Sequence, residues 1–245
     1  MNEQWKAAIG GGAIGAVLSL ACVFAAGQFG FLPGTTDARL HSYLVAHPYL
    51  LVEMTEKLQK AEAEKEQQGR QAAIDKVGLK RLFDPSVAYV TGPANPKNTF
   101  VEFFDYNCVH CRNSFAAVKK FYDAHKGDTR FAFIEYPVFG DASNAAARVA
   151  VAARQQSDRY LALHFLLMSE KNAIDDATLY AGAKKAGLDM AKLSAALLAP
   201  DLTRPIVAAH KIGEQAKIDG TPTFVINGKL HIGEITEADF KRLTR

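Results

Sequence analysis

Cys108 and Cys111 are the two side chains of this 245-residue chain whose type and spacing could do redox chemistry. Two thiols separated by two residues can open and close an intramolecular disulfide, which moves two electrons to or from another thiol pair. The motif Cys108-Val109-His110-Cys111 follows an apolar run typical of a buried strand, and apolar residues recur after it at helical spacing. We therefore expect a helix that begins near Cys108.

The start of a helix favours a thiolate. Its unpaired backbone N–H groups and the positive end of its dipole stabilise a negative sulfur, and an imidazole at His110 adds to this field. Cys108 is therefore the predicted nucleophile. Cys111 lies one turn along, where it can attack a mixed disulfide at Cys108 and release the substrate. The sequence predicts catalysis by the redox-active disulfide Cys108–Cys111, with no other cofactor and no metal.

Other uses of the same dithiol stay open at this point. A structural zinc site would need two more ligands, and the only other cysteine, Cys22, lies in an apolar N-terminal run. A purely structural disulfide over so short a loop would stabilise the fold little. A soft cation such as Cu(I) could bind Cys108, Cys111 and His110, which would make the chain a copper-handling protein. A non-catalytic assembly module is a third alternative.

Residues 1–36 read as an export signal or a membrane anchor. No charged side chain occurs from Ala7 to Pro33, and Lys6 supplies a short positive segment before the apolar core. Both a cleaved signal and a retained inner-membrane anchor fit this pattern. We expect a periplasmic or envelope location, where disulfides persist. The formal net charge of +3 is too small to indicate nucleic-acid binding.

Residues 37–86 are expected to form a helical stalk. Leucines recur along the first part, Pro48 should divide it into two helices, and Glu53 and Lys57 are spaced for an ion pair. The stripe thins into a polar stretch that has no core of its own to pack on. Two interpretations stay open: a solvated spacer, or an oligomerisation region over 37–70 in which leucines pair with other copies of the chain.

Residues 87–245 have the length and patterning of a catalytic α/β domain. A strand over 99–105, a helix over 108–125 and a strand over 129–136 predict a β-α-β unit with parallel strands. Asn227-Gly228 between two apolar runs predicts a hairpin, followed by a last helix. Between these halves, about 141–219 is interpreted as a helical insertion. Its expected helices cover 145–155, 159–169, 177–186, 190–198 and 206–217.

This arrangement resembles the thioredoxin fold, and the helical insertion resembles its DsbA branch. The resemblance is carried by the motifs Val101-Glu102-Phe103-Phe104-Asp105-Tyr106-Asn107-Cys108-Val109-His110-Cys111 and Gly220-Thr221-Pro222-Thr223-Phe224-Val225-Ile226-Asn227-Gly228. The segment 40–48 is similar to a subgroup that includes the suppressor-of-copper-sensitivity C proteins, some of which oligomerise through this region and isomerise disulfides. The resemblance implies a thiol:disulfide oxidoreductase that acts on cysteine-containing exported proteins. It also implies a membrane redox partner, either a reductase or a quinone-linked oxidase.

The resemblance also assigns three residues outside the dithiol. Pro222 matches a cis-proline beside the active site, where the backbone is free to bind an extended substrate. Thr221 matches the residue before that proline, which touches the dithiol. Glu102 matches a buried acid beneath Cys111 that can shuttle a proton; an outward-facing residue on an edge strand is the alternative.

Two departures from the family pattern bear on the direction of the reaction. Ile134 stands where the subgroup often has a lysine that could partner Glu102. Val109 stands between the cysteines where the strongly oxidising branch has a proline. The sequence therefore leaves oxidase and isomerase as alternatives.

Overall fold

The structure is a computed structural model that describes residues 35–244. The predicted signal or anchor therefore lies, but for its last two residues, outside the described part of the chain. The chain divides into two units, one that ends at Lys65 and one that begins at Glu66. Over 35–244, no helix is long and apolar enough to span a bilayer.

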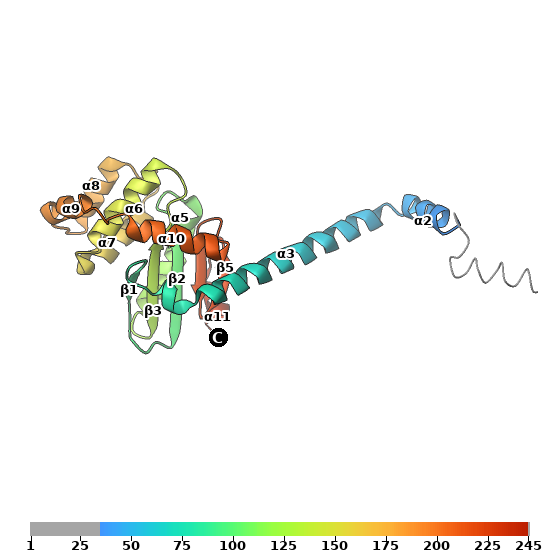
Figure 1. Cartoon of the computed structure of the whole chain (residues 1–245), viewed down its shortest axis with the longest axis horizontal. Coiled ribbons are helices and arrows are strands. Elements are labelled where there is room, and N and C mark those ends of the chain that lie inside the picture. The colour runs from blue at the N-terminus through green and yellow to red at the C-terminus, as the bar shows by residue number, and fades with distance from the viewer. Residues whose placement is uncertain (1–34, 245) are drawn as a thin grey trace, which may run out of the picture. The chain divides into compact units, whose positions relative to one another are not determined.

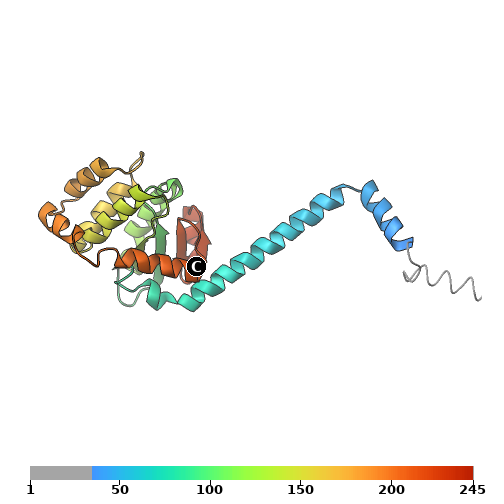
Figure 2. The ribbon, with the colours of Figure 1, turned by 45° about the horizontal axis from the view of Figure 1, so that its top comes forward.

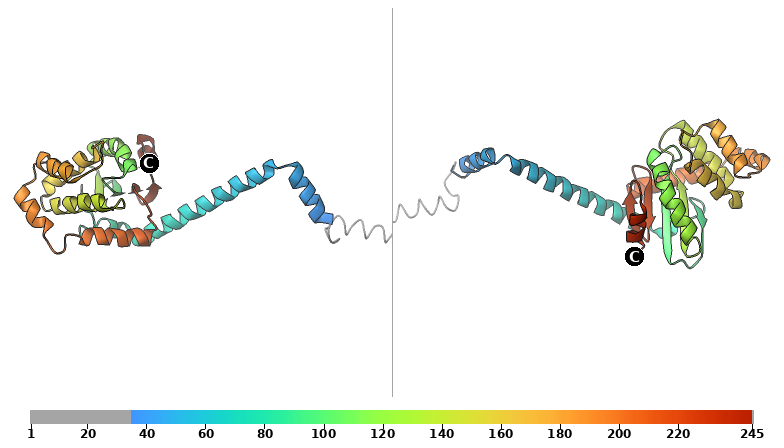
Figure 3. Two further views of the ribbon diagram at one scale, coloured as in Figure 1. Left: turned by 90° about the horizontal axis from the view of Figure 1, so that it is seen from above. Right: turned by 180° about the vertical axis from the view of Figure 1, so that it is seen from behind.

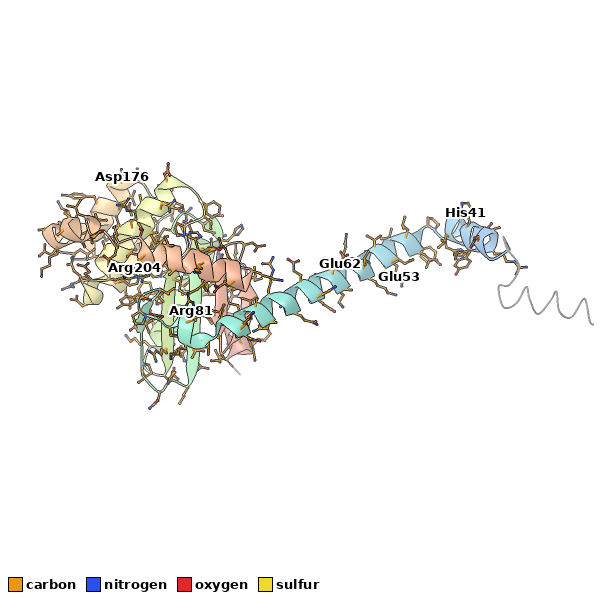
Figure 4. All side chains as sticks on the ribbon, in the orientation of Figure 1. His41, Glu53, Glu62, Arg81, Asp176 and Arg204 are labelled. Atoms are coloured by element: carbon orange, nitrogen blue, oxygen red, sulfur yellow. The ribbon has the colours of Figure 1, made fainter. Side chains whose placement is uncertain are left out.

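The first unit is helical. Helix α2 (Thr35–Ala46) ends just before Pro48, and helix α3 (Tyr49–Val77) begins just after it, so the predicted break is confirmed. The Lys57 ammonium donates to the Glu53 carboxylate at 2.6 Å. Figure 4 shows His41, Glu53 and Glu62 projecting outward from these helices. The exposed large apolar side chains here are Leu40, Tyr43, Leu44, Val45, Tyr49, Leu51, Val52, Met54 and Leu58.

The second unit is built on a five-stranded sheet in the order β1-β3-β2-β4-β5 (Figure 1). Its strands are β1 (Tyr89–Thr91), β2 (Asn98–Phe104), β3 (Thr129–Glu135), β4 (Thr223–Ile226) and β5 (Lys229–Ile232). Strands β2 and β3 are parallel, as predicted, while the other pairs are antiparallel. Strand β1 was not predicted from the sequence, because three half-buried residues are too few to show an alternating pattern.

Helices cover both faces of this sheet. Phe100 and Phe104 of β2 face a core that includes residues of α5 (Val109–His125) and α11 (Glu237–Leu243). Val101 and Phe103 alternate with them and face a core that includes α10 (Arg204–Ala216). Figure 1 shows α10 in front of the sheet, and the view from behind in Figure 3 shows α5 on the other side. Strand β2 is therefore central and buried on both faces.

The region predicted as one insertion has two parts. Helices α6 (Asp141–Ala153), α7 (Ser157–Met168), α8 (Asp176–Lys185) and α9 (Met190–Leu197) contact one another and form a group beside the sheet (Figure 2). Helix α10 instead packs against β3, because its apolar face, with Ala209, Ile212 and Ala216, is buried there. The last of the five predicted helices thus belongs to the layers of the sheet.

Residues from the end of the predicted stalk also pack into the second unit. Ile74 of α3 and Leu82 of the short helix α4 (Leu79–Leu82) are buried in the same core as α10. The Gln71 side chain donates to the carbonyl of Gly228 at 2.7 Å and accepts from the N–H of Leu230 at 2.8 Å. The compact unit that carries the sheet therefore starts at Glu66, ahead of the 87–245 range expected from the sequence.

The predicted hairpin is confirmed residue by residue. β4 and β5 flank Asn227-Gly228, and the two turn residues have positive φ, 51° at Asn227 and 78° at Gly228. A two-residue turn of this kind requires positive φ at both positions, which asparagine and glycine tolerate best. The turn places the segment that precedes β4, with Pro222, at the carboxyl end of β2.

Candidate active site

The Asp105 carboxylate organises the turn between β2 and the dithiol. Asp105 is buried directly after β2, and its backbone carbonyl accepts from the N–H of Cys108 at 3.1 Å. Its side-chain oxygens accept from the N–H groups of Asn107 (2.8 Å), Val138 (2.7 Å) and Phe139 (3.2 Å) and from the Ser143 hydroxyl (2.7 Å). One anion thus joins the approach to Cys108, the segment after β3 and the first turn of α6.

Cys108 occupies the N-cap position of α5, with an extended backbone, φ −74° and ψ 117°. Its Sγ lies 3.1 Å from the carbonyl oxygen of Thr221, which accepts from the sulfur when Cys108 is protonated, and the Thr221–Pro222 peptide bond is cis. Cys108 and Cys111 are free thiols, each 1% exposed. The structure therefore brings the helix start and the segment with Pro222 into direct contact, although 113 residues separate Cys108 from Thr221.

The two thiols have opposite electrostatic environments. A hydrogen bond from Cys111 is the largest influence that lowers the pKa of Cys108 to about 5, while the Thr221 side chain and the N–H groups of Cys111 and His110 also lower it, against the effect of burial. Burial raises the pKa of Cys111 far above its usual value, and the charges of Cys108 and Glu102 raise it further. At neutral pH the first sulfur is a thiolate and the second a thiol.

Glu102 is buried on the central strand, at 2% exposure, with Phe133 and Phe224 beside it on the neighbouring strands. The alternative of an outward-facing edge residue is therefore wrong. Burial raises the pKa of Glu102 to about 8, and its Oε2 atom has no hydrogen-bond partner. The charge of its ionised form raises the pKa of Cys111.

Ile134, which stands where the subgroup often has a lysine, offers no charge to pair with Glu102. Ile134 is buried in the core on the α10 side of the sheet. The next residue, Glu135, is buried and pairs with Arg154, which directly follows α6, and it accepts from the Tyr160 hydroxyl at 2.6 Å. This acid therefore has its own partners, away from the dithiol motif in the sequence.

His110 is exposed and is held by a residue that the sequence analysis missed. Its Nδ1 lies 2.6 Å from Oε1 of Glu234, in the loop between β5 and α11. The same oxygen accepts from the Asn113 amide at 2.8 Å. The hydrogen bond to Glu234 is the largest influence that raises the pKa of His110, and the Cys108 charge raises it as well. Glu234 lies 124 residues from His110, so no sequence spacing indicates this contact.

Exposed apolar side chains surround the dithiol. Val109, at 52% exposure, follows Cys108, and Val138 and Phe139, the latter at 57%, are held near it by Asp105. Ile232 is exposed on β5 opposite Thr223, next to Pro222. We call these four residues the apolar rim.

The described residues contain no group of three or more His, Cys, Asp or Glu side chains placed to hold a metal ion. The copper-handling alternative would use Cys108, Cys111 and His110, and the Nδ1 atom of that histidine is engaged by Glu234.

Comparisons with known proteins agree with this geometry. Residues 86–244 match the model of the thioredoxin family. The chain belongs to the thioredoxin family. Its fold is the DsbA-like form, as the sequence resemblance predicted.

Solved structures give the extent of the likeness. A thioredoxin-like oxidoreductase from Silicibacter pomeroyi is 34% identical, with 66% of this chain and 92% of that chain covered and a TM-score of 0.61. BcfH from Salmonella enterica Typhimurium is 24% identical over 86% of this chain and 94% of its own, with a TM-score of 0.72. A linker-deletion mutant of Proteus mirabilis ScsC is 20% identical over 85% of this chain and 91% of its own, with a TM-score of 0.65.

The curated relatives are much longer than this thioredoxin-family chain. The Na(+)/H(+) antiporter NhaA 3 of Salinispora tropica is 26% identical over 152 residues, which are 61% of this chain. The match spans 23% of the length of that relative.

The lowered pKa of Cys108 gives a direct titration test. In the reduced protein, the ultraviolet absorbance of the thiolate should rise with a midpoint near pH 5. A free thiol titrates near pH ~8.5, so this difference stabilises the reduced native state at neutral pH, and the stabilisation is lost as the pH falls through about 5. In Cys111→Ala, which lacks the largest cause, the midpoint should move upward. A midpoint at the ordinary thiol value in the unmodified protein would contradict this electrostatic account.

Glu102→Gln tests the buried carboxyl through stability. Because burial raises the pKa of Glu102 from 4.5 to about 8, the protein should lose stability as the pH rises from 4.5 through 8. The amide variant has no such group. Its free energy of unfolding, relative to that of the unmodified protein, should therefore increase by roughly a few kcal/mol over this range. Urea unfolding at pH 5 and pH 8 measures the effect. Parallel pH dependences in the two proteins would rule it out.

Proposed function

We propose that this protein is an exported thiol:disulfide oxidoreductase of the periplasm that exchanges disulfides with cysteine-containing exported proteins. Family membership supports thiol–disulfide exchange in general. The observation that carries the proposal is the division of labour in the dithiol: the Cys108 sulfur has a pKa lowered to about 5 and touches the Thr221 carbonyl, while the pKa of Cys111 is raised. Exchange needs one sulfur that attacks and leaves as a thiolate, and a second that stays protonated until it gives up its proton to resolve the mixed disulfide.

These positions assign each residue a step when the protein oxidises a substrate. A substrate thiolate attacks the sulfur of Cys108, the Cys108–Cys111 bond breaks, and its electron pair goes to Cys111. Glu102, protonated at neutral pH because of its raised pKa, gives its proton to Cys111. A second substrate thiolate then attacks the substrate sulfur of the mixed disulfide, and Cys108 leaves as the stabilised thiolate. The reverse steps reduce a substrate disulfide, with Cys111 as the resolving thiol.

The surroundings of the dithiol suit an extended polypeptide with apolar residues. The backbone at Thr221 and Pro222 lies beside Cys108, where it can align a substrate strand. The apolar rim offers contact area for side chains that flank the substrate cysteine. These features favour unfolded or partly folded proteins, whose cysteines and apolar side chains are accessible.

The direction in the cell depends on the redox partner, which we propose to be a membrane protein. A quinone-linked oxidase would keep the dithiol oxidised, and a membrane reductase would keep it reduced. The uncharged run from Ala7 to Pro33 supports export or tethering to the inner membrane, where either partner would be met. The same dithiol serves both roles, because the potentials that separate them differ by only tens of millivolts.

Replacement of each cysteine tests the exchange reaction. Cys108→Ser should abolish insulin reduction, because no thiolate remains at the helix start. Cys111→Ser should instead accumulate a mixed disulfide with substrate, because the resolving thiol is missing, and mass spectrometry measures this adduct. Unchanged insulin reduction by the Cys108→Ser variant would end the proposal.

We also propose that the chain self-associates through residues 37–70. The exposed apolar side chains of α2 and of the first part of α3 support this, since covering an apolar surface of this kind lowers the free energy.

The full chain should therefore have the mass of an oligomer by light scattering, and Leu51→Glu with Leu58→Glu should reduce it to that of a monomer. A matched pair of polar sites, Glu62→Gln with Glu64→Gln, should leave the mass unchanged. A monomeric unmodified chain would contradict self-association.

A further inference from the structure

The loop between β5 and α11 is attached to the first turn of α5 by several polar contacts. Oε1 of Glu234 lies 2.6 Å from Nδ1 of His110 and accepts from Asn113 at 2.8 Å. The N–H of Ile235 donates to the Ser114 hydroxyl at 3.1 Å, and that hydroxyl donates to the His110 carbonyl at 2.9 Å. Backbone and side chain of His110 are therefore both held from this loop.

We propose that Glu234 is a positioning residue for thiol–disulfide exchange: it holds a charged His110 imidazolium beside the Cys108 thiolate and so sets how oxidising the dithiol is. The inference rests on the proposed function and names the residue that sets the oxidising strength of the same dithiol. Glu234 acts through His110, since its carboxylate contacts the histidine and Asn113.

The charges around His110 give the physical reason. Cys108 faces it from the start of α5, and Glu234 faces it from the β5–α11 loop. His231 of β5 also contacts the loop, with its Nε2 2.8 Å from the Glu234 carbonyl oxygen. The Glu234 carboxylate raises the pKa of His110, which keeps the imidazolium charged to higher pH. A positive ring near the sulfur favours the thiolate over the disulfide, and so makes the dithiol a stronger oxidant.

The equilibrium with glutathione shows where this charge acts. When the dithiol closes, the Cys108 thiolate and the Cys111 thiol lose two electrons, and Cys111 releases one proton. Glutathione disulfide gains the two electrons and becomes two thiols, with one proton from Cys111 and one from the solvent. The imidazolium stabilises the side of this balance that holds the Cys108 thiolate, and the disulfide has no charge for it to stabilise.

Glu234→Gln tests the proposal because the amide keeps the shape and the acceptor oxygen but loses the charge. The equilibrium with glutathione is measured from pH 5 to pH 9 for the full chain. The break in the profile that reports His110 should move to lower pH. At pH values between the break of the variant and the break of the unmodified protein, the variant should be roughly two- to five-fold less oxidising, the size expected for an exposed ion pair. High salt should shrink this difference.

Two further variants separate positioning from other effects. Glu237→Gln removes an exposed carboxylate that pairs with Lys120 rather than His110, and it should leave the profile unchanged. In a His110→Gln background, Glu234→Gln should have no further effect. The proposal would be overturned if the break did not move in Glu234→Gln. It would also be overturned if Glu234→Gln changed the glutathione equilibrium by the same factor in the His110→Gln background. An unmodified protein that does not equilibrate with glutathione would instead overturn the proposed function.

Discussion

A buried carboxylate that must be satisfied holds the site together. Asp105 lies at the carboxyl end of β2, where water is excluded, and an unpaired anion there would cost several kcal/mol. Its four donors come from the turn before Cys108, from the segment after β3 and from α6. Because all four donate to one carboxylate, they hold the three segments in one arrangement. The helix that carries the dithiol starts from that arrangement.

A second set of contacts holds the segment with Pro222 against this helix start. The Tyr136 hydroxyl donates to the carbonyl of Ile218 at 3.0 Å. Arg70, from the last part of α3, donates to the carbonyl of Lys217 and to both carboxylate oxygens of Asp219. These contacts lie just before Thr221, whose carbonyl meets Cys108. The residues from Glu66 onward are thus part of the scaffold of the site, even though the family match begins at residue 86.

The same exclusion of water gives the dithiol its asymmetry. Cys108 has hydrogen-bond donors at the helix start, so its negative form is stabilised despite burial. Cys111 and Glu102 lack comparable donors, so burial keeps both protonated at neutral pH. The protonated Glu102 can therefore supply a proton to the Cys111 sulfur when the disulfide opens. His110 and Glu234 add an exposed charge pair at the rim, where solvent access lets it respond to pH and salt.

The sequence by itself determined the features that repeat over a few residues. The strand before Cys108, the helix after it, the Asn227-Gly228 hairpin and the break at Pro48 follow from periodicity, turn chemistry and the missing proline N–H. The types and order of Cys108 and Cys111 were enough to predict their separate roles. The place of Pro222 was predictable through a family motif.

Only the tertiary structure decided which distant groups meet. The burial of Glu102, the donors to Asp105, the seat of α10 on the sheet and the pairing of His110 with Glu234 depend on segments brought together by packing. Arg70 and Asp219 are 149 residues apart, and no local pattern records such a pair. Periodicity reports which face of an element is apolar. The partner of a polar side chain is set by where the folded backbone places it.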